Sequence, residues 1–382
     1  MQRSKVKVAH ISSVHKPRDV RIFEKQCKTL AKNGYDVHLL VPDDNGWEED
    51  EVKVHAVRKS ANRIIRMTIT VHKLYRLALK VNAGIYHFHD PELIPLGILL
   101  RLRGKIVIRD IHEDHPKQML SKKWIAPVFR SIISLFIKSL EKLSSRFFNA
   151  IITVTPSINK RFSDLESVVI QNYPQFELNQ PVTNKEISGD PYMTFVGGIT
   201  SIRGIMEMLD ALEIVNNSNS GKKLRFILVG SFETSALEND AKNHEGWKYT
   251  EFKGWLDRNQ VNRIMESALA GLVLYHPVPN HVDAQPNKLF EYMSNGLPIV
   301  ASDFPLWREI IDSDQCGLLA NPLEPKEIAD QILYILDNPE EARVMGENGR
   351  RAVIEKYNWE SESVKLVNLY EKLSKKYKNK LK

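Results

Sequence analysis

Cysteine is almost absent from this 382-residue chain. The two cysteines, Cys27 and Cys316, stand far apart and form neither a CxxC pair nor a cluster with histidine. This spacing argues against a disulfide framework or a structural zinc site, and it fits a reducing cytosol. Long apolar runs are also missing, because the best stretch, residues 124–140, is broken by Arg130 and Lys138. We therefore expect no membrane-spanning helix, and we expect no signal peptide because MQRSKVKVAHISS leads directly into a predicted strand.

Acidic residues are unevenly distributed. Residues 1–180 contain 30 Lys and Arg against 18 Asp and Glu, whereas the remainder contains 24 against 29. The net charge of +7 therefore hides a basic first half and an acidic second half. The chain is long enough for two domains with separate cores. The charge asymmetry predicts that these domains have different partners and that the first meets something anionic.

Acids are scarcest in residues 52–89, which contain none. Apolar residues recur there along one stripe of a predicted helix, and cations recur along another. These cations are Lys59, Arg63, Arg66, Lys73, Arg76 and Lys80. A solvated face usually mixes both signs, so this stripe predicts contact with an anionic membrane surface. The alternative is a solubilising helix that packs on its own domain. Nucleic-acid binding is not expected, because no aromatic interleaving or recognition-helix pattern accompanies the charge.

Strands and helices alternate along the chain. Buried strands are predicted at residues 6–12, 35–41, 84–89, 105–110, 147–154, 168–172, 193–196, 224–230, 249–254, 269–275 and 297–301. Helices are predicted between them, which indicates parallel α/β sheets. The segment 173–191 is polar, contains proline and lacks periodicity, so it is predicted to link a first domain, 1–172, to a second, 192–356.

The stretch 283–303, DAQPNKLFEYMSNGLPIVASD, is the most informative. Proline at its start and Gly296 at its end bound a predicted helix over residues 287–295. The first turn of a helix leaves backbone N–H groups unpaired, and Lys288 stands in that turn, which predicts an anion site. Glu291 shares a face with Lys288, where its carboxylate would accept hydrogen bonds from hydroxyls attached to the anion, such as those of ribose. The alternative is a surface helix in which the lysine and the glutamate only pair with each other.

Two other segments follow predicted strands at the edge where parallel sheets bind ligands. Residues 193–212, MTFVGGITSIRGIMEMLDAL, lead from a glycine-ended strand into a helix, an arrangement that cradles phosphate. Arg203 lies there, and its guanidinium matches phosphate oxygens unless it is simply a surface arginine. The loop 12–21 follows the first strand, and four of its polar residues are candidate ligand contacts, with Asp19 also suited to cap the next helix. These four are His15, Arg18, Asp19 and Arg21.

A third segment, IHEDHP, ends the strand predicted at 105–110. It places His112 and Glu113 at the carboxyl end of that strand, with His115 close by. One alternative is a loop histidine that is merely satisfied by its neighbours. Another is a metal cluster, but two histidines three residues apart in a non-helical loop have poor zincin geometry.

These segments together resemble the GT-B glycosyltransferases, specifically the retaining family-four or group 1 enzymes, over nearly the whole chain. PNKLFEYMSNGLPIVASD is similar to the donor-site signature of that family, which has two glutamates separated by seven residues. Glu291 falls on the second glutamate, and Asp283, a shorter acid, falls on the first. The family's diphosphate clamp has an arginine where this chain has Gly198 and a lysine where it has Arg203. One cation is thus missing, and Lys288 would compensate for it.

The resemblance implies an α/β fold of two Rossmann-like domains facing each other across a cleft, with a C-terminal helix, residues 357–382, returning to the first domain. It implies transfer of a hexose-type sugar from a nucleotide-diphosphate donor, with a UDP-sugar favoured, to an acceptor hydroxyl with retention of anomeric configuration. Bacterial surface polysaccharide or lipid-linked glycan assembly at the inner face of the membrane is the expected setting. No cofactor or essential metal is expected, since no Asp-x-Asp motif stands where a metal-dependent transferase would place one.

The resemblance also assigns residues to roles. The catalytic residues would be His112 near the anomeric carbon, Arg203 and Lys288 on the diphosphate, and Asp283 on the sugar hydroxyls. The donor-binding residues would be Gly198, Arg203, Gly230, Trp255, Leu256, Asn287, Lys288, Leu289 and Glu291. The acceptor would meet His15, Arg18, Asp19 and Arg21. The leaving phosphate would take the acceptor proton, so no protein base is needed.

Two other functions fit part of the pattern. A nucleotide-sugar 2-epimerase shares this kind of two-domain fold, but it would need further carboxylates beside the sugar and would not explain the cationic segment. A non-catalytic nucleotide-sugar-binding partner of a membrane complex would be consistent with the missing clamp arginine and with Asp283 in place of glutamate.

Overall fold

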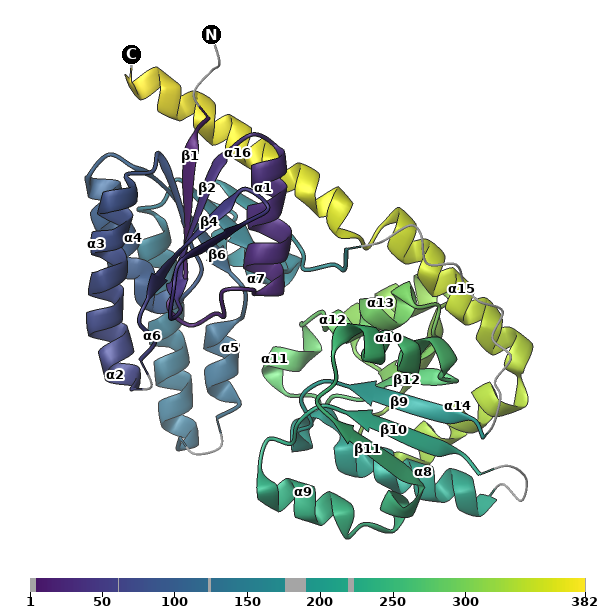
Figure 1. The fold of residues 1–382 in the computed structure, drawn as a ribbon. Helices are drawn as coiled ribbons and strands as arrows, with labels where there is room; N and C mark the ends of the chain where they lie inside the picture. Colours follow the sequence, from purple (N-terminus) through teal and green to yellow (C-terminus); the bar gives the residue numbers. More distant parts are fainter. Residues whose placement is uncertain (1–4, 61, 123–124, 176–189, 219–222, 382) are drawn as a thin grey trace. The chain divides into compact units, whose positions relative to one another are not determined.

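The computed structural model describes residues 5–60, 62–122, 125–175, 190–218 and 223–381. The chain forms two compact units, unit 1 (Met1–Asn172 with Trp359–Lys382) and unit 2 (Tyr173–Asn358), each built on its own sheet (Figure 1). Most of the predicted linker, residues 176–189, lies outside the described residues. Among those that are described, no helix is both long and apolar enough to span a membrane.

Unit 1 is built on an eight-stranded sheet in the order β3-β4-β2-β1-β5-β6-β7-β8. All neighbouring pairs are parallel except β3 and β4. The strands are β1 (Lys7–Ile11), β2 (Asp36–Pro42), β3 (Trp47–Glu49), β4 (Val52–Val57), β5 (Ile85–Phe88), β6 (Ile106–Ile111), β7 (Ala150–Thr153) and β8 (Ser167–Val169). The strand order reverses between β1 and β5, and this switch point is where open α/β sheets bind ligands.

The hairpin of β3 and β4 was not predicted. Its turn places Asp50 and Glu51 in the left-handed region, with φ of 51° and 60°. Asn-Gly or Asp-Gly is the usual signal for such a turn. An acidic pair lacks that signal, so the sequence did not indicate a hairpin here.

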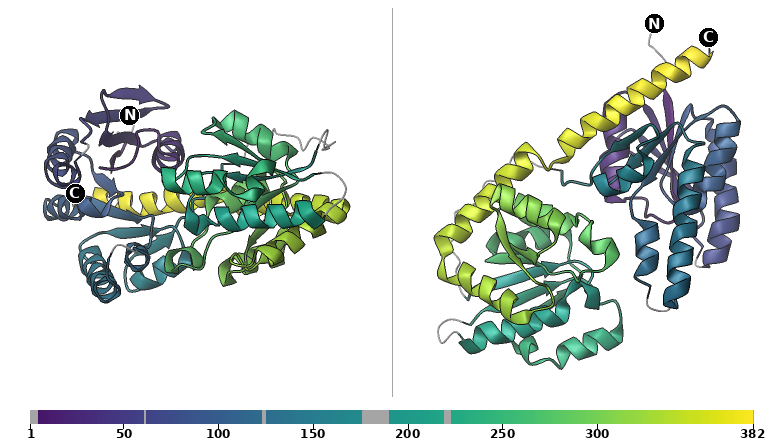
Figure 2. Two further views of the ribbon diagram at one scale, coloured as in Figure 1. Left: turned by 90° about the horizontal axis from the view of Figure 1, so that it is seen from below. Right: turned by 180° about the vertical axis from the view of Figure 1, so that it is seen from behind.

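Helices cover both faces of the unit 1 sheet (Figures 1 and 2). They are π-helices Val20–Cys27 and Arg66–Thr70, 3-10 helices Pro91–Leu93 and Lys160–Phe162, and α1 (Lys28–Lys32), α2 (Arg63–Ile65), α3 (Val71–Val81), α4 (Ile94–Leu102), α5 (His115–Leu120), α6 (Pro127–Ser145), α7 (Pro156–Asn159) and α16 (Trp359–Leu381). α16 contributes Leu366, Leu369, Tyr370 and Leu373 to the core of unit 1, so the predicted return of the C-terminal helix is confirmed.

The cationic segment is only partly the helix that was predicted. Lys59 lies in the connection before α2, so its assignment to a helical stripe is wrong. Arg66 pairs with Glu92 of a neighbouring segment, with Nε to Oε1 at 2.9 Å. The second half, α3, buries Leu74 and Ala78 in its own domain, as the alternative interpretation expected.

Unit 2 is built on a six-stranded parallel sheet in the order β11-β10-β9-β12-β13-β14. The strands are β9 (Tyr192–Val196), β10 (Arg225–Val229), β11 (Thr250–Gly254), β12 (Ala270–Val273), β13 (Ile299–Ser302) and β14 (Gly317–Ala320). This is the 3-2-1-4-5-6 order of a dinucleotide-binding sheet, with its switch point between β9 and β12. The predicted parallel α/β architecture is therefore confirmed in both units.

The helices of unit 2 pack on both faces of this sheet (Figure 2). They are 3-10 helices Ser201–Arg203 and Glu245–Tyr249, and α8 (Ile205–Ser218), α9 (Ser235–Lys242), α10 (Arg258–Ser267), α11 (Pro279–Val282), α12 (Asn287–Ser294), α13 (Pro305–Asp314), α14 (Pro325–Asp337) and α15 (Pro339–Glu355). Gly296 follows α12 with φ of +63°, the left-handed conformation predicted for it.

Candidate active site

The first group of predicted site residues gathers at the switch point of unit 2, around two loops that touch through their glycines. Gly197 follows β9, and Gly230 follows β10 with φ of +138°. A Cβ on Gly230 would lie 1.9 Å from the carbonyl oxygen of Gly197, so only glycine allows this approach. Likewise, a Cβ on Gly197 would lie 2.5 Å from Lys288 Nζ. We call Gly197, Gly198, Gly230, Arg203 and Lys288 the glycine cradle.

Two cations line the glycine cradle. Arg203 donates from Nη1 to the carbonyl oxygen of Gly198 at 2.9 Å. Lys288, in the first turn of α12, places Nζ 3.3 Å from Tyr275 Oη and 5.0 Å from the centre of the Phe195 ring. Neither cation forms an ion pair with a carboxylate anywhere in the described part of the chain. No side chain caps α12 either, so its positive end also faces this region without a protein anion.

The surroundings make the charge of Lys288 costly. Burial and the positive charge of Arg203 together lower the pKa of the Lys288 ammonium to about 7. A buried lysine shifts in this direction when nothing negative compensates for lost hydration. An anion bound in the glycine cradle would supply that compensation and restore the charged form. The cradle therefore has the geometry and the electrostatics of an anion site.

Glu291 lies one turn beyond Lys288 on α12, as predicted, but its partner is different. Its Oε1 accepts a hydrogen bond from Arg258 Nη1 at 3.1 Å, so the alternative pairing with Lys288 is not observed. Arg258 begins α10, directly after the loop that carries Trp255 and Leu256. Trp255 is 82% exposed, which leaves its ring free to stack on a planar group. Asn287 and Leu289 flank Lys288 in the same turn, whereas Asp283 stands at the end of the preceding short helix, α11.

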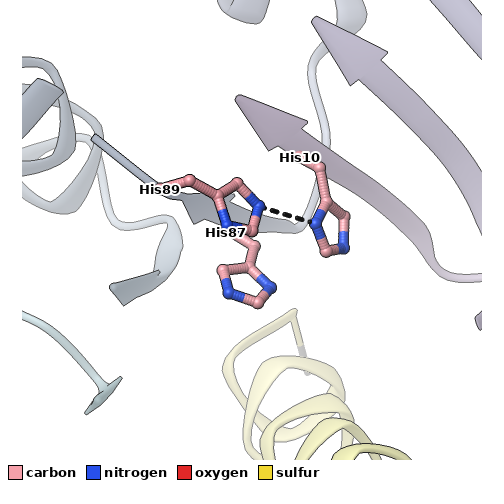
Figure 3. Close-up of side chains that lie close together, drawn as sticks. All are labelled: His10, His87 and His89. Carbon is pink, nitrogen blue, oxygen red and sulfur yellow. Dashed lines mark hydrogen bonds between the residues drawn. The ribbon is translucent and has the colours of Figure 1, made fainter. Parts of the chain in front are cut away.

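The second group of site residues lies in unit 1, on one face of the sheet at its own switch point. His10 of β1 and His87 of β5 are register partners, and His89 follows two residues later on the same face. All three side chains are buried, and Figure 3 shows their rings turned toward one another above α16. Asp110, near the end of β6, is buried beside them. Sequence reasoning found only His112 of this cluster.

These side chains form a continuous chain of hydrogen bonds, which we call the histidine chain. It joins His112 Nε2 to His89 Nδ1 (3.0 Å), His89 Nε2 to His10 Nδ1 (3.1 Å), His10 Nε2 to Tyr370 Oη (3.2 Å) and Tyr370 Oη to His87 Nδ1 (2.8 Å). The pKa values of His10 and His89 are held well below the usual value by burial, and burial lowers the pKa of His112 to about 4. The rings are therefore neutral at neutral pH, and each carries one N–H.

Asp110 sets the direction of donation along the histidine chain. Its Oδ2 lies 3.7 Å from His87 Nε2 and 3.5 Å from His112 Nε2. A nitrogen that turns its lone pair toward a carboxylate is repelled by it, so both of these nitrogens favour carrying the hydrogen. Placing the hydrogen on Nε2 of both rings satisfies every link: His112 donates to His89, His89 to His10, His10 to Tyr370, and Tyr370 to His87. The opposite direction would turn two lone pairs toward Asp110, whereas this direction turns only that of His89 Nδ1, which lies 3.6 Å from Oδ2. His112 thus keeps Nδ1 as an acceptor.

Asp110 is held in its charged form by donors. Burial alone would raise its pKa, but the Arg21 guanidinium and the nearby histidines hold that pKa well below the usual range. Arg21 donates from Nε and Nη2 to the two carboxylate oxygens at 3.1 and 2.9 Å, and Gln26 adds a bond of 2.7 Å. Arg21 is therefore buried inside unit 1 rather than presented by the loop to which sequence reasoning assigned it.

The histidines also have the spacing of metal ligands. Two trios bring their ligand atoms close together: His10 with His87 and His89, and His89 with Asp110 and His112. Asp110 is already paired with the positively charged Arg21, and this charge would repel a metal ion bound at the same carboxylate. Most ring nitrogens of these two trios are also engaged in the histidine chain, which accounts for their proximity, whereas His87 Nε2 has no hydrogen-bond partner.

The remaining acceptor-loop residues divide between this cluster and the surface. His15 pairs with Asp90 (Nδ1 to Oδ1, 3.1 Å), and its ring centre lies 5.3 Å from that of His112, so these two predicted residues are brought together. Burial works against the charged form of His15, but the bond with Asp90 outweighs it and raises the pKa. Arg18 lies apart, over the Trp47 ring. Asp19 caps the helix that follows, accepting from the backbone N–H groups of residues 21 and 22, as its alternative interpretation proposed.

Two family models match the chain, Glycosyltransferase Family 4 over residues 20–172 and Glycosyl transferases group 1 over residues 178–352. The solved sucrose-phosphate synthase from Thermosynechococcus elongatus superposes with a TM-score of 0.77 at 18% identity, covering 97% of this chain and 99% of that one. The chain is a GT-B glycosyltransferase of the group 1, family-four type. The predicted family and fold class are thus confirmed.

Other similarities of this glycosyltransferase are more distant or shorter. Anabaena HepE, solved in complex with UDP and glucose, has a TM-score of 0.71 at 13% identity and covers 96% of this chain and 100% of that one. The MMP alpha-(1->4)-mannosyltransferase of Mycolicibacterium hassiacum is 37% identical over 83 residues, 22% of this chain. That match spans only 20% of the mannosyltransferase's own length.

Four residues of the glycosyltransferase escaped sequence reasoning at the first site: Phe195, Arg258, Tyr275 and His281. Tyr275 contacts both cations of the glycine cradle, and its ring lies 4.9 Å from that of His281. Burial lowers the pKa of His281 to about 4, so it adds no charge. Tyr275 follows β12 just as Gly197 follows β9, and its position after a strand next to the switch point was the signal available in the sequence.

Proposed function

We propose that this glycosyltransferase transfers a hexose-type sugar from a nucleotide-diphosphate donor, a UDP-sugar by preference, to an acceptor hydroxyl with retention of the anomeric configuration. The observation that carries the proposal is the pair of cations, Arg203 and Lys288, that face the glycine cradle without a carboxylate partner in the described chain. A diphosphate carries the charge that this pair lacks, and the glycines let it approach the backbone closely.

Departure of the nucleoside diphosphate is the step that the glycine cradle would assist. Negative charge develops on the leaving phosphate as the glycosyl bond breaks. Arg203, Lys288 and the N-terminal amides of α12 are fixed in place to stabilise that charge. The two cations take the part that a metal ion plays in metal-dependent transferases, so we propose that no metal is essential. Full activity in excess EDTA is the expected result.

The other donor contacts follow from position. Glu291 would hold the ribose hydroxyls, with Arg258 fixing its carboxylate, and Trp255 with Leu256 would meet the base. Asp283 would meet the sugar hydroxyls. In unit 1, Nδ1 of His112 would accept a hydrogen bond from the donor sugar and help to steady its oxocarbenium-like transition state. The leaving phosphate would take the acceptor proton.

The acceptor is proposed to meet unit 1. We infer a glycan or lipid-linked alcohol of bacterial surface polysaccharide assembly, met at the loop of His15, Arg18 and Asp19. The cations of residues 59–80 would bring the enzyme to the inner, anionic face of the membrane. This setting is supported by the basic composition of unit 1.

The donor site is tested by calorimetry with UDP, GDP and their hexose conjugates on wild type, Glu291→Ala and Lys288→Met. We expect one nucleotide family to bind, with affinity reduced in both variants. Lys248→Met is a matched control, because Lys248 is an exposed lysine of unit 2 that pairs with Glu245 and lies over the Tyr249 ring, outside the glycine cradle. Absence of binding by every conjugate would refute the donor site.

Retention is tested without a known acceptor. Slow hydrolysis of an α-linked donor releases the free sugar, and proton NMR in the first minutes gives its anomeric form before mutarotation. We expect the α anomer. The β anomer would show inversion, binding without any turnover would favour the non-catalytic partner, and a change at C2 of the bound donor would reveal an epimerase.

A further inference from the structure

Helix α6 (Pro127–Ser145) buries polar residues and exposes most of its apolar ones. The residues it buries are Glu141, Ser144 and Ser145. Most of its large apolar side chains are exposed instead, and only Ile133 and Ile137 are half-buried. A helix on the surface of a soluble domain normally buries its apolar stripe and turns its polar residues to water. The orientation of α6 is the reverse, so a physical reason is needed.

Ion pairs hold α6 in this orientation. Glu141 Oε1 lies 3.2 Å from Nη2 of Arg109, a buried residue of β6, and Glu141 Oε2 lies 3.3 Å from Nη1 of Arg161. Arg109 also donates from Nη1 to Ser145 Oγ at 3.2 Å. Rotating the helix to bury its apolar side would remove the partners of a buried arginine. That change is costly, so the apolar face stays outward.

The exposed face is large and continuous. Its members in the helix recur at the spacing of one helical face and are between 46% and 72% exposed: Val128, Phe129, Ile132, Leu135, Phe136, Leu140 and Leu143. Phe147, just beyond the helix end, is 46% exposed as well. Nineteen residues of helix extend over roughly 28 Å. Contiguous apolar surface of this extent marks an interaction site rather than ordinary exposure.

The charges on and beside this face are positive. Lys138, Lys142 and Arg146 are exposed along α6, and the helix's only carboxylate, Glu141, is buried. Asp164 lies 3.7 Å from both Lys142 and Arg146 and offsets part of this charge. The face therefore combines aromatic and aliphatic side chains with an excess of cations.

A second segment of the same unit repeats this combination. In α2 and the π-helix after it, Ile64, Met67 and Ile69 are each 46% or more exposed. Arg63 stands among them, and no acid occurs from residue 52 to residue 89. Figure 1 shows that α2 and the start of α6 both reach past the same end of the unit 1 sheet.

We propose that the exposed face of α6 inserts into the interface of an anionic lipid bilayer, with the α2 segment as a second contact. Helix α6 would lie flat on the membrane, with its apolar side chains among the upper acyl groups and its lysines at the phosphates. The inference deepens the membrane association proposed above, because it assigns attachment to an inserted helix rather than to a cationic stripe alone.

The charge pattern favours lipid over protein as the occupant. A second copy of this chain that met the same face in a two-fold dimer would bring the lysine-bearing edge of each α6 to the interface, where the facing α6 has no exposed carboxylate to pair with it. Lysine is also depleted from the cores of protein interfaces. An anionic bilayer accommodates both features, since phosphates neutralise the cations while acyl chains cover the phenylalanines.

The test is co-sedimentation of the full chain with vesicles of phosphatidylcholine alone or with 30% phosphatidylglycerol. We expect the wild type to bind the anionic vesicles strongly and the neutral vesicles weakly. Phe129→Ser/Phe136→Ser should lower the partition coefficient at least tenfold. Lys138→Gln/Lys142→Gln should remove the preference for anionic lipid. Val344→Ser/Ile354→Ser on α15 is the matched control, because both residues are exposed and apolar but belong to unit 2.

Three results would overturn the proposal. The first is failure of the wild type to bind anionic vesicles, and the second is undiminished vesicle binding by the phenylalanine double variant. The third is a wild-type protein that binds no lipid and forms a dimer, which the double variant converts to a monomer. Donor calorimetry on the double variant separates this proposal from the donor site. Normal nucleotide binding with lost lipid binding supports the α6 surface, and failure of nucleotide binding in the wild type leaves the lipid result standing.

Discussion

The two polar centres of this glycosyltransferase solve the problem of buried charge in opposite ways. In unit 2, Arg203 and Lys288 crowd together with no carboxylate partner among the described residues. In unit 1, Asp110 is surrounded by donors, and the histidine chain uses almost every polar atom it contains. The first centre is incomplete without a ligand. The second is satisfied from within the protein except at His87 Nε2 and Gln26 Oε1, which are buried without a hydrogen-bond partner.

This difference separates binding from positioning. An unsatisfied cation pair costs folding stability and gains affinity when an anion arrives. A hydrogen-bonded network holds its members in one arrangement, and in the proposed function it leaves one group, Nδ1 of His112, to meet the substrate. Substitutions in unit 2 should therefore change affinity more than stability, and substitutions in unit 1 should change stability first.

The largest expected effect comes from Asp110→Asn. The amide keeps the shape but removes the charge that balances the buried Arg21, so the free energy of unfolding of unit 1 should fall by about 3–5 kcal/mol. Urea unfolding followed by tryptophan fluorescence measures it. Asp164→Asn is the control, since that exposed carboxylate lies 3.7 Å from its partners and should cost less than about 1 kcal/mol. Equal losses of unfolding free energy in both variants would contradict the proposed importance of the buried Asp110 charge.

Next is Lys288→Met, which should weaken donor binding about 100-fold while leaving the melting temperature unchanged or higher. The methionine keeps the apolar stem and removes an ammonium whose burial is uncompensated. Calorimetry gives the affinity, and differential scanning calorimetry gives the melting temperature. A variant that melts well below wild type would show that Lys288 supports the fold instead.

Tyr370→Phe should have an intermediate effect. It removes the hydroxyl that links His10 to His87, leaving two buried nitrogens without that partner, at a cost of about 1–3 kcal/mol. Tyr35→Phe is the control, because its ring packs against Tyr370 but stands outside the histidine chain. Nitrogen NMR of the histidines should show hydrogen on Nε2 of His112 in the wild type. Hydrogen on Nδ1 would reverse the direction of the chain.

The smallest effect expected is on pH dependence. Free Lys288 has its pKa lowered to about 7, and a bound diphosphate should raise it, so donor binding takes up a proton. Affinity for a nucleotide sugar should be full below pH 7 and should fall by at most about tenfold per unit as pH rises above 7. Calorimetry from pH 6 to 9 in two buffers of different ionisation enthalpy tests both points. The Lys288→Met variant should lack the slope, and a flat wild-type profile would contradict it.

The donor half of the molecule was largely readable from the sequence because its determinants are local. A glycine pair after one strand and a lysine in the first turn of a helix each fit within twenty residues. The sequence did not show that Gly197 receives the Lys288 side chain, or that Tyr275 and Arg258 complete the arrangement, because these contacts join separate strands and helices.

The polar centre of unit 1 was less predictable, because its contacts join residues that are far apart in the sequence. His112 was found through its motif, but its partners come from β1, β5, β6 and α16, which are brought together only by folding. The alternation of His87 and His89 in one strand was a readable sign that they share a face. In helix α6 the apolar pattern does not indicate the buried side, because the ion pair of Glu141 with Arg109 turns the polar side of the helix inward.

The position of α16 also fixes the order in which the protein can be completed. This helix belongs to unit 1, but all of unit 2 precedes it in the chain. During synthesis, residues 173–358 can leave the ribosome and fold while the core of the first unit still lacks Leu366, Leu369 and Leu373. Tyr370 arrives with them, so the ring of His112 is set only in the last step of assembly. A chain released before α16 would carry a complete glycine cradle in unit 2 but an incomplete histidine chain in unit 1.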